Sequence, residues 1–208
     1  MSLKLNTQPS SNTPPLDPGS YPGRVLSIVD LGRQARSPFQ GQERAPINMV
    51  LFTYELSDEF MSDEAGNEIP GKPRVTSEKF ALHPLSSERA TSTKRYLALD
   101  PAREYGGDLA RLVALPTMIT LVQNVQKGTG RIFNNVASLS PMRAKDVANC
   151  PELVNPSFFF DLDEPNPTIW SLMHDWVKKI VKDNLDYSGS NLQRLLEGEG
   201  ESSADNPF

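Results

Sequence analysis

Basic and aromatic side chains occur together at four places in the chain, and this combination suits a phosphate polymer with flat bases. Lysine and arginine can follow phosphates, and exposed rings can stack on unpaired bases. The connection 32–44 also contains two glycines and a proline, so we expect a mobile, exposed loop there. The candidate contacts are Arg33, Arg36, Phe39 and Arg44; Lys72, Arg74 and Lys79; Lys94, Arg95 and Tyr96; and Lys127, Arg131 and Phe133.

Catalytic motifs are scarce. The sequence contains no G-x-x-x-x-G-K-[ST], no G-x-G-x-x-G and no G-x-S-x-G. His83 and His174 stand alone, and Cys150 is the only cysteine, which leaves too few ligands for a typical zinc site. We therefore expect no enzyme activity, no cofactor and no metal.

The acidic segment Asp58–Glu64 is the one cluster that resembles a metal-dependent nuclease site. It runs into Ala65-Gly66-Asn67, a sequence typical of a tight turn. We expect a solvated acidic loop between two strands, and a nuclease is retained as an alternative.

The last four residues, Asp205, Asn206, Pro207 and Phe208, follow an acidic spacer that contains glycine and serine. A bulky ring beside a carboxylate on such a spacer suits a partner pocket that is apolar at its base and basic at its rim. These four residues are the candidate partner-binding site.

Charge is divided unevenly along the 208 residues, whose net charge is −5. Residues 24–145 carry 16 basic and 13 acidic side chains, whereas residues 146–208 carry 4 basic and 12 acidic ones. A mildly basic body therefore precedes an acidic C-terminal part, and the acidic total does not exclude nucleic acid as a ligand.

These residues need a scaffold, and the pattern predicts one that is mainly β. Runs rich in β-branched and aromatic residues predict strands at 24–31, 47–56, 74–82, 117–125 and 131–139. Between the third and fourth strands, residues 86–99 predict a helix and residues 108–114 a shorter helical turn. This order is that of the OB-fold, a five-stranded barrel that binds oligonucleotides, although other small barrels and α+β sheets share it.

The flanking segments have their own patterns. Residues 1–20 contain four prolines and many polar side chains, and we expect a flexible arm; we also expect residues 197–208 to be disordered. The extension 146–196 holds an amphipathic stripe from Ile169 to Val181, which predicts a helix over about 167–185. This helix either docks on the barrel, in residues 21–145, or forms a homodimer contact.

The body and the tail resemble a known family. The tail looks like that of bacterial single-stranded-DNA-binding proteins, although its residues before Pro-Phe are less densely acidic. Over about three-fifths of the chain, the body resembles bacteriophage single-stranded-DNA-binding proteins with an OB-fold; the matching stretches are Tyr21–Val25, Asp30–Gln34, Thr53–Leu56, Gly71–Val75 and Ser92–Pro101.

The resemblance implies coating of single-stranded DNA during phage replication and recombination. It also implies that the tail recruits a polymerase, helicase or nuclease. The competing interpretation is a structural or assembly protein whose small barrel docks to other proteins. No stretch is long and apolar enough for a membrane span, so we expect no membrane association and a location in the host cell cytoplasm.

Overall fold

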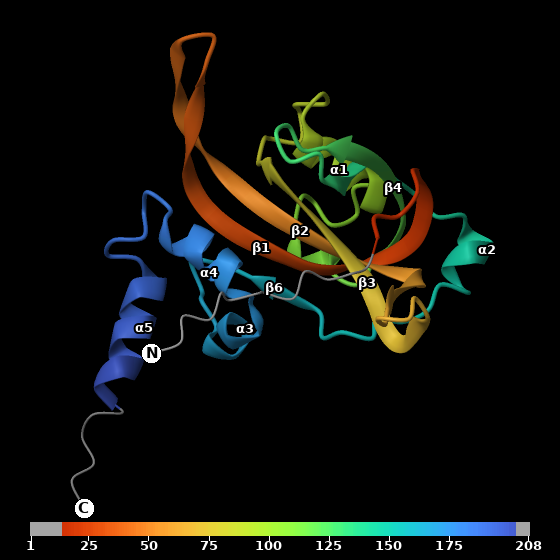
Figure 1. The fold of residues 1–208 in the computed structure, drawn as a ribbon. Coiled ribbons are helices and arrows are strands. Elements are labelled where there is room, and N and C mark those ends of the chain that lie inside the picture. Colours follow the sequence, from red (N-terminus) through yellow and green to blue (C-terminus); the bar gives the residue numbers. More distant parts are fainter. Residues whose placement is uncertain (1–13, 203–208) are drawn as a thin grey trace, which may run out of the picture.

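Five antiparallel strands form one strongly curled sheet in the computed structural model, which describes residues 14–202, with side chains as far as Gly198 (Figure 1). In space the strands follow the order β3-β2-β1-β4-β5. The mainly β prediction is confirmed: the sheet is a curled half-barrel. The strands are β1 (Gly19–Phe39), β2 (Gln42–Ser62), β3 (Glu68–Ala81), β4 (Pro116–Val125) and β5 (Ile132–Ser140).

Each face of the sheet buries its own apolar cluster, because successive side chains of a strand point to opposite faces. Ile28, Phe52 and Tyr54 belong to the cluster on the concave inner face. Val29 and Leu51 belong to the cluster on the convex outer face. The sheet is therefore a layer between two cores.

The inner core is closed by the segment between β3 and β4. This segment contains the helix α1 (Thr91–Leu99) and the short 3-10 helix η1 (Ala110–Leu112). Tyr96 of α1 and Leu112 of η1 are fully buried against the strands. The helix begins at Thr91 rather than at the expected residue 86, because residues 84–90 form two successive turns, with Ser87 donating to Pro84 and Ala90 to Ser87.

The outer core is covered by the C-terminal part of the chain (Figure 1). A short strand, Phe158–Phe160, pairs in parallel with β1 at Ser27–Val29, just past the residues that pair with β4. Its brevity kept it from being predicted. The elements of this part are α2 (Ala144–Val147), β6 (Phe158–Phe160), α3 (Pro167–Leu172), α4 (Asp175–Lys182) and α5 (Asn191–Ser202).

Two charged side chains, the buried Glu55 and the partly buried Arg24, tie this C-terminal part to the sheet. The Glu55 carboxylate accepts hydrogen bonds from the backbone amides of Val154 and Asn155 at 2.7 and 3.0 Å. The Arg24 guanidinium donates to the carbonyl oxygens of Cys150 and Pro151 at 2.9 and 2.8 Å. These contacts join residues about a hundred positions apart, so they depend on the completed fold.

The helix expected over 167–185 is two helices. Asn166 caps α3 by accepting from the amides of Thr168 and Ile169, as its position before a proline predicted. At Met173 and His174 the backbone is extended, with ψ of 144° and 148°. This break points Met173 into the outer core.

The connection 32–44 is not a mobile loop. β1 and β2 continue as a two-stranded ribbon whose pairing runs from Arg33 opposite Asn48 to Phe39 opposite Gln42. Gln40 and Gly41 turn the chain with φ of 51° and 77°, the left-handed geometry that suits a two-residue hairpin. We name residues 33–48 the β1–β2 arm; it projects from the sheet in Figure 1.

Parts of the expected flexible ends are also ordered. The Leu16 backbone exchanges hydrogen bonds of 2.8 Å with the Asn134 side chain, which fixes the described start of the chain on β5. At the other end, residues 197–202 lie in α5. Residues 1–13 and 203–208 lie outside the described part. No helix in residues 14–202 combines the length and apolar character that crossing a membrane requires.

Candidate nucleic-acid interface

The β1–β2 arm carries an exposed ring among unpaired cations. Phe39, next to the turn, is 61% exposed, and the Arg44 guanidinium lies 5.9 Å from its ring centroid. Arg36 pairs with Arg44 across the ribbon. Among the side chains that the structure describes, from Pro14 to Gly198, no carboxylate lies within 4.0 Å of either arginine. The arm therefore offers two free positive charges and a π-face.

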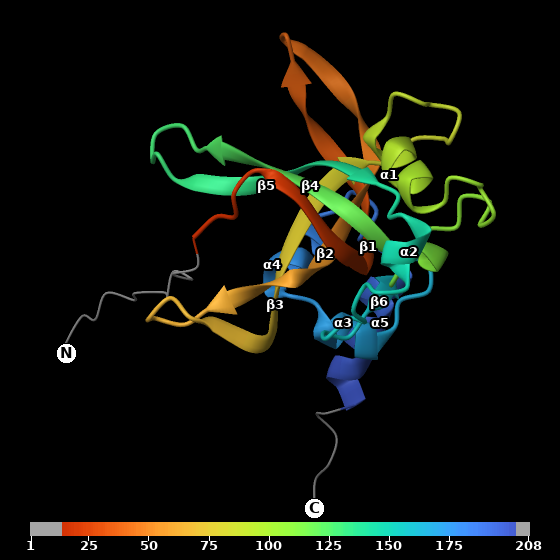
Figure 2. The same ribbon diagram turned by 90° about the vertical axis from the view of Figure 1, so that its right-hand side faces the viewer.

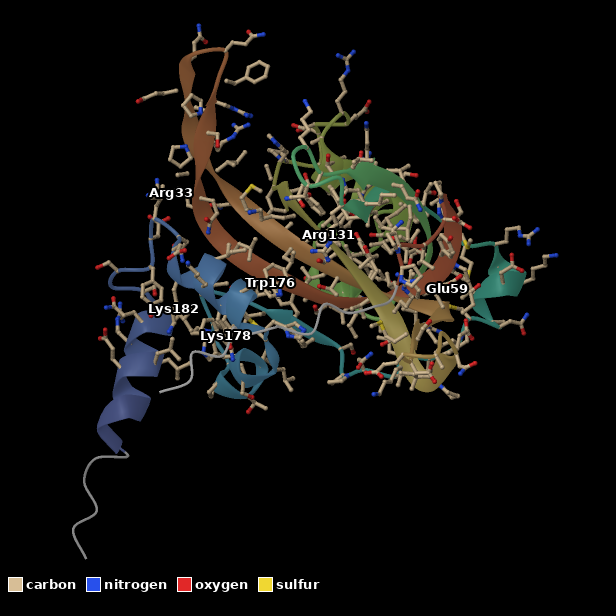
Figure 3. All side chains as sticks on the ribbon, viewed as in Figure 1. Arg33, Glu59, Arg131, Trp176, Lys178 and Lys182 are labelled. Atoms are coloured by element: carbon tan, nitrogen blue, oxygen red, sulfur yellow. The ribbon has the colours of Figure 1, made fainter. Side chains whose placement is uncertain are left out.

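Arg33, at the base of the same arm, is differently placed. Its Nε and Nη2 donate to the two carboxylate oxygens of Asp186 at 2.9 and 2.5 Å. Its backbone oxygen also accepts from the amide of Leu185. Arg33, labelled in Figure 3, thus links the arm to the C-terminal part, and a phosphate would have to compete with Asp186 for its guanidinium.

A second arm is the β4–β5 hairpin, residues 122–135, which points away from the β1–β2 arm in Figure 2. Lys127 and Arg131 are exposed, and no carboxylate of the described residues lies within 4.0 Å of them. Phe133 is 38% exposed beside them. We name this hairpin the β4–β5 arm; Val125 and Ile132 add exposed apolar surface to it.

Arg95 was expected to contact a ligand, but its side chain is buried. It forms an ion pair with Glu78 of β3, with Nε–Oε1 and Nη2–Oε2 distances of 2.7 and 2.9 Å. Nη2 also donates to the Ala137 carbonyl of β5 at 3.2 Å. A helix places every third or fourth side chain on its inner face, so Arg95 turns inward while its neighbour Lys94 is exposed.

Tyr96 is likewise part of the core, because it is fully buried against the inner cluster. Its hydroxyl donates to the Asp100 carboxylate at 2.6 Å and accepts from the Gly107 amide at 2.8 Å. Burial, followed by the hydrogen bond to Asp100, raises the pKa of Tyr96. The ring has no free face, so Tyr96 is removed from the candidate stacking residues.

Because side chains alternate along a strand, Lys72 and Arg74 of β3 point to one face of the sheet and Lys79 to the other. Lys72 and Lys79 are exposed. Arg74 is half-buried and donates to the Pro14 carbonyl at 2.8 Å, and burial lowers the pKa of its guanidinium. Arg74 therefore holds the described start of the chain against β3.

Most of the acidic segment Asp58–Glu64, expected to be a loop, continues the strand β2 as far as Ser62, and the turn begins only at Asp63. Asp63 accepts from the amides of Ala65 and Asn67 at 2.9 and 2.8 Å, and these hydrogen bonds lower its pKa. Burial raises the pKa values of Asp58 and Glu59, which lie in β2. In the described residues no three His, Cys, Asp or Glu side chains are grouped so that they could hold a metal ion.

Trp176 of α4 is half exposed and was not among the expected rings (Figure 3). The sequence placed it in the apolar stripe, so its exposure depends on the break before α4.

The candidate residues Asp205–Phe208 lie outside the described part. No protein-family model matches the chain, and none of the curated proteins matches it.

Proposed function

We propose that this protein binds and protects single-stranded DNA without catalysis, in phage DNA replication and recombination. The observation that carries the proposal is the composition of the two arms. Each presents an exposed phenylalanine next to cations that have no carboxylate partner among the described residues. Single-strand binders combine these groups, because cations follow the phosphates and rings stack on the bases.

The arrangement of strands supports the same proposal. An OB-fold is a partly open five-stranded barrel, and it binds oligonucleotides with its strand 2–3 face and with the β1–β2 and β4–β5 connections. Here β1 pairs with both β2 and β4, and the arms are those two connections. We infer an OB-fold in which α1 is the insertion between strands three and four.

We further propose that the acidic C-terminal residues, ending in Pro207-Phe208, recruit replication proteins such as a polymerase, helicase or nuclease. The support is the charge pattern, because residues 146–208 carry an excess of eight acidic side chains over basic ones. A segment that is repelled by DNA remains available to a protein partner.

The second candidate is a structural or assembly protein. The observation that favours it is the apolar surface of the β4–β5 arm, where Val125 is 63% exposed. Exposed apolar patches of this kind commonly mark protein contacts.

A titration of the full chain with fluorescent oligo-dT tests the proposal. We expect binding at about 50 mM salt that weakens steeply at about 200 mM, because released counterions drive phosphate contacts. An absence of binding at the lower salt concentration would refute DNA binding and favour the assembly role.

A further inference from the structure

An apolar groove of about 520 Å³ crosses the outer face of the sheet, between β3 and the two helices α3 and α4. Its floor is formed by Leu51 and Thr53 of β2, and one wall by Val75 of β3. Leu172 and Trp176 form the opposite wall. We name it the Trp176 groove; Figure 3 shows Trp176 on α4.

The walls of this groove are exposed although they are apolar. Trp176 is 51% exposed and Val75 52% exposed, whereas the neighbouring Trp170 is buried in the outer core. Exposed apolar walls around a cavity of a few hundred cubic ångströms are typical of a binding site. The indole ring offers a broad flat surface to a ligand.

Charge at the groove is positive along β3. Lys79 lies two positions after Ser77, so it stands on the same face of β3 as Val75 and Ser77, at one end of the strand segment that lines the groove. Lys79 is exposed, and among the side chains described, up to Gly198, no carboxylate lies within 4.0 Å of it. An apolar floor beside a free cation fits a base and its flanking phosphate.

The strand β2, which forms the floor of the groove, also leads into the β1–β2 arm. Along β2, Thr53 lies opposite Ser77, Leu51 opposite Lys79 and Met49 opposite Ala81. From Met49 the same strand runs on to Arg44, so Thr53 and Arg44 are about 30 Å apart along the chain at roughly 3.3 Å per residue. One strand thus leads from the groove, past Lys79, to the cations and Phe39 of the arm.

We propose that the Trp176 groove binds unstacked bases of single-stranded DNA, with Trp176 stacking on a base and Lys79 contacting the adjacent phosphate. This inference rests on the proposed function and adds a site to it. An apolar peptide would use the same walls but would have no need for Lys79. The DNA path then runs along β2 and β3 to the β1–β2 arm.

The test compares Trp176→Ala with Leu185→Ala, which removes another half-exposed apolar side chain outside the groove. With fluorescent oligo-dT we expect Trp176→Ala to bind roughly 5- to 150-fold more weakly, the equivalent of one lost stacking contact. Leu185→Ala should bind like the unchanged protein. Thermal unfolding of each variant checks that it is folded.

Tryptophan fluorescence gives a second readout that does not depend on losing affinity. We expect oligo-dT to quench the unchanged protein, and Trp176→Phe, which keeps a ring for stacking, to retain binding but lose most of the quenching. If the unchanged protein binds DNA and Trp176→Ala binds equally well, this inference is wrong and the proposed function stands. If the unchanged protein does not bind DNA, both are wrong.

Discussion

Arg95 of α1 and Glu78 of β3 form a two-point ion pair at the place where the two free edges of the curled sheet approach each other. The Arg95 guanidinium also donates to the carbonyl oxygens of Val136 and Ala137 on β5, at 3.4 and 3.2 Å. Glu78 accepts in addition from the Tyr54 hydroxyl at 2.8 Å. Backbone pairing does not join β3 to β5 in the sheet, so these side chains bridge the gap.

Replacing Arg95 by alanine is expected to destabilise the fold by about 3–5 kcal/mol, because Glu78, whose side chain is only 14% exposed, would be left charged without its cationic partner. Urea unfolding measures this change. The matched control is Lys94→Ala, which removes an exposed neighbouring cation and should change the free energy of unfolding by less than about 0.5 kcal/mol. A stable Arg95→Ala protein with weakened DNA binding would return Arg95 to the interface.

Replacing Arg36 and Arg44 together by alanine should weaken binding to every DNA sequence alike. At roughly 0.7 per phosphate contact on a single strand, the slope of log affinity against log salt should flatten by about 1.4. Arg33→Ala is the control on the same arm, and we expect it to leave the slope unchanged because Asp186 already holds that guanidinium. Equal effects of replacing Arg33, Arg36 and Arg44 would contradict the distinction between Arg33, which is paired with Asp186, and the other two arginines.

Phe39→Ala and Phe133→Ala should each cost about 1–3 kcal/mol of DNA binding, the usual value of one stacked base. Both rings are exposed, so the thermal midpoint should hardly move. Tyr96→Phe should behave in the opposite way, since it removes a buried hydrogen bond to Asp100 and leaves the arms intact. A loss of folding in Phe39→Ala or Phe133→Ala would show that the ring packs in the core.

Deleting residues 197–208, which hold four acidic side chains, should leave DNA affinity equal or higher, most visibly at low salt, because the deletion removes negative charge that competes with DNA. The same deletion, or Phe208→Ala alone, should abolish capture of replication proteins in a pull-down. Truncation that weakens DNA binding while capture persists would show that these residues belong to the DNA site instead.

The strands could be predicted because their β-branched and aromatic residues recur where the sheet is buried, as in Val25–Leu31. Their full lengths could not, since the β1–β2 arm is polar and its turn, Gln40-Gly41, lacks the usual Asn-Gly signal. Proline and glycine in that segment predicted a loop, but cross-strand pairing holds it as a ribbon.

The candidate site was predictable to a similar degree. The exposure of the cations on the two arms could be predicted, because these residues lie in polar segments of the sequence. Arg95 and Lys94 are adjacent in the sequence and opposite in burial: Arg95 lies on the buried face of α1, where Glu78 of a distant strand pairs with it. The exposure of Trp176 could not be predicted. The residue fits the apolar stripe of one long helix, and little in the local sequence indicates the break between α3 and α4.

The position of β6 has a consequence for the order in which the protein can fold during synthesis. All five strands of the sheet are complete at Ser140, but Phe160, Trp170, Val181 and Leu192, which cover Val29, Leu31 and Leu51, are translated later. Until then the growing chain presents an uncovered apolar face to the cell. Since Leu192 of α5 belongs to this cover, we expect the exposed apolar face to favour aggregation of the nascent chain until its last helix has been synthesised.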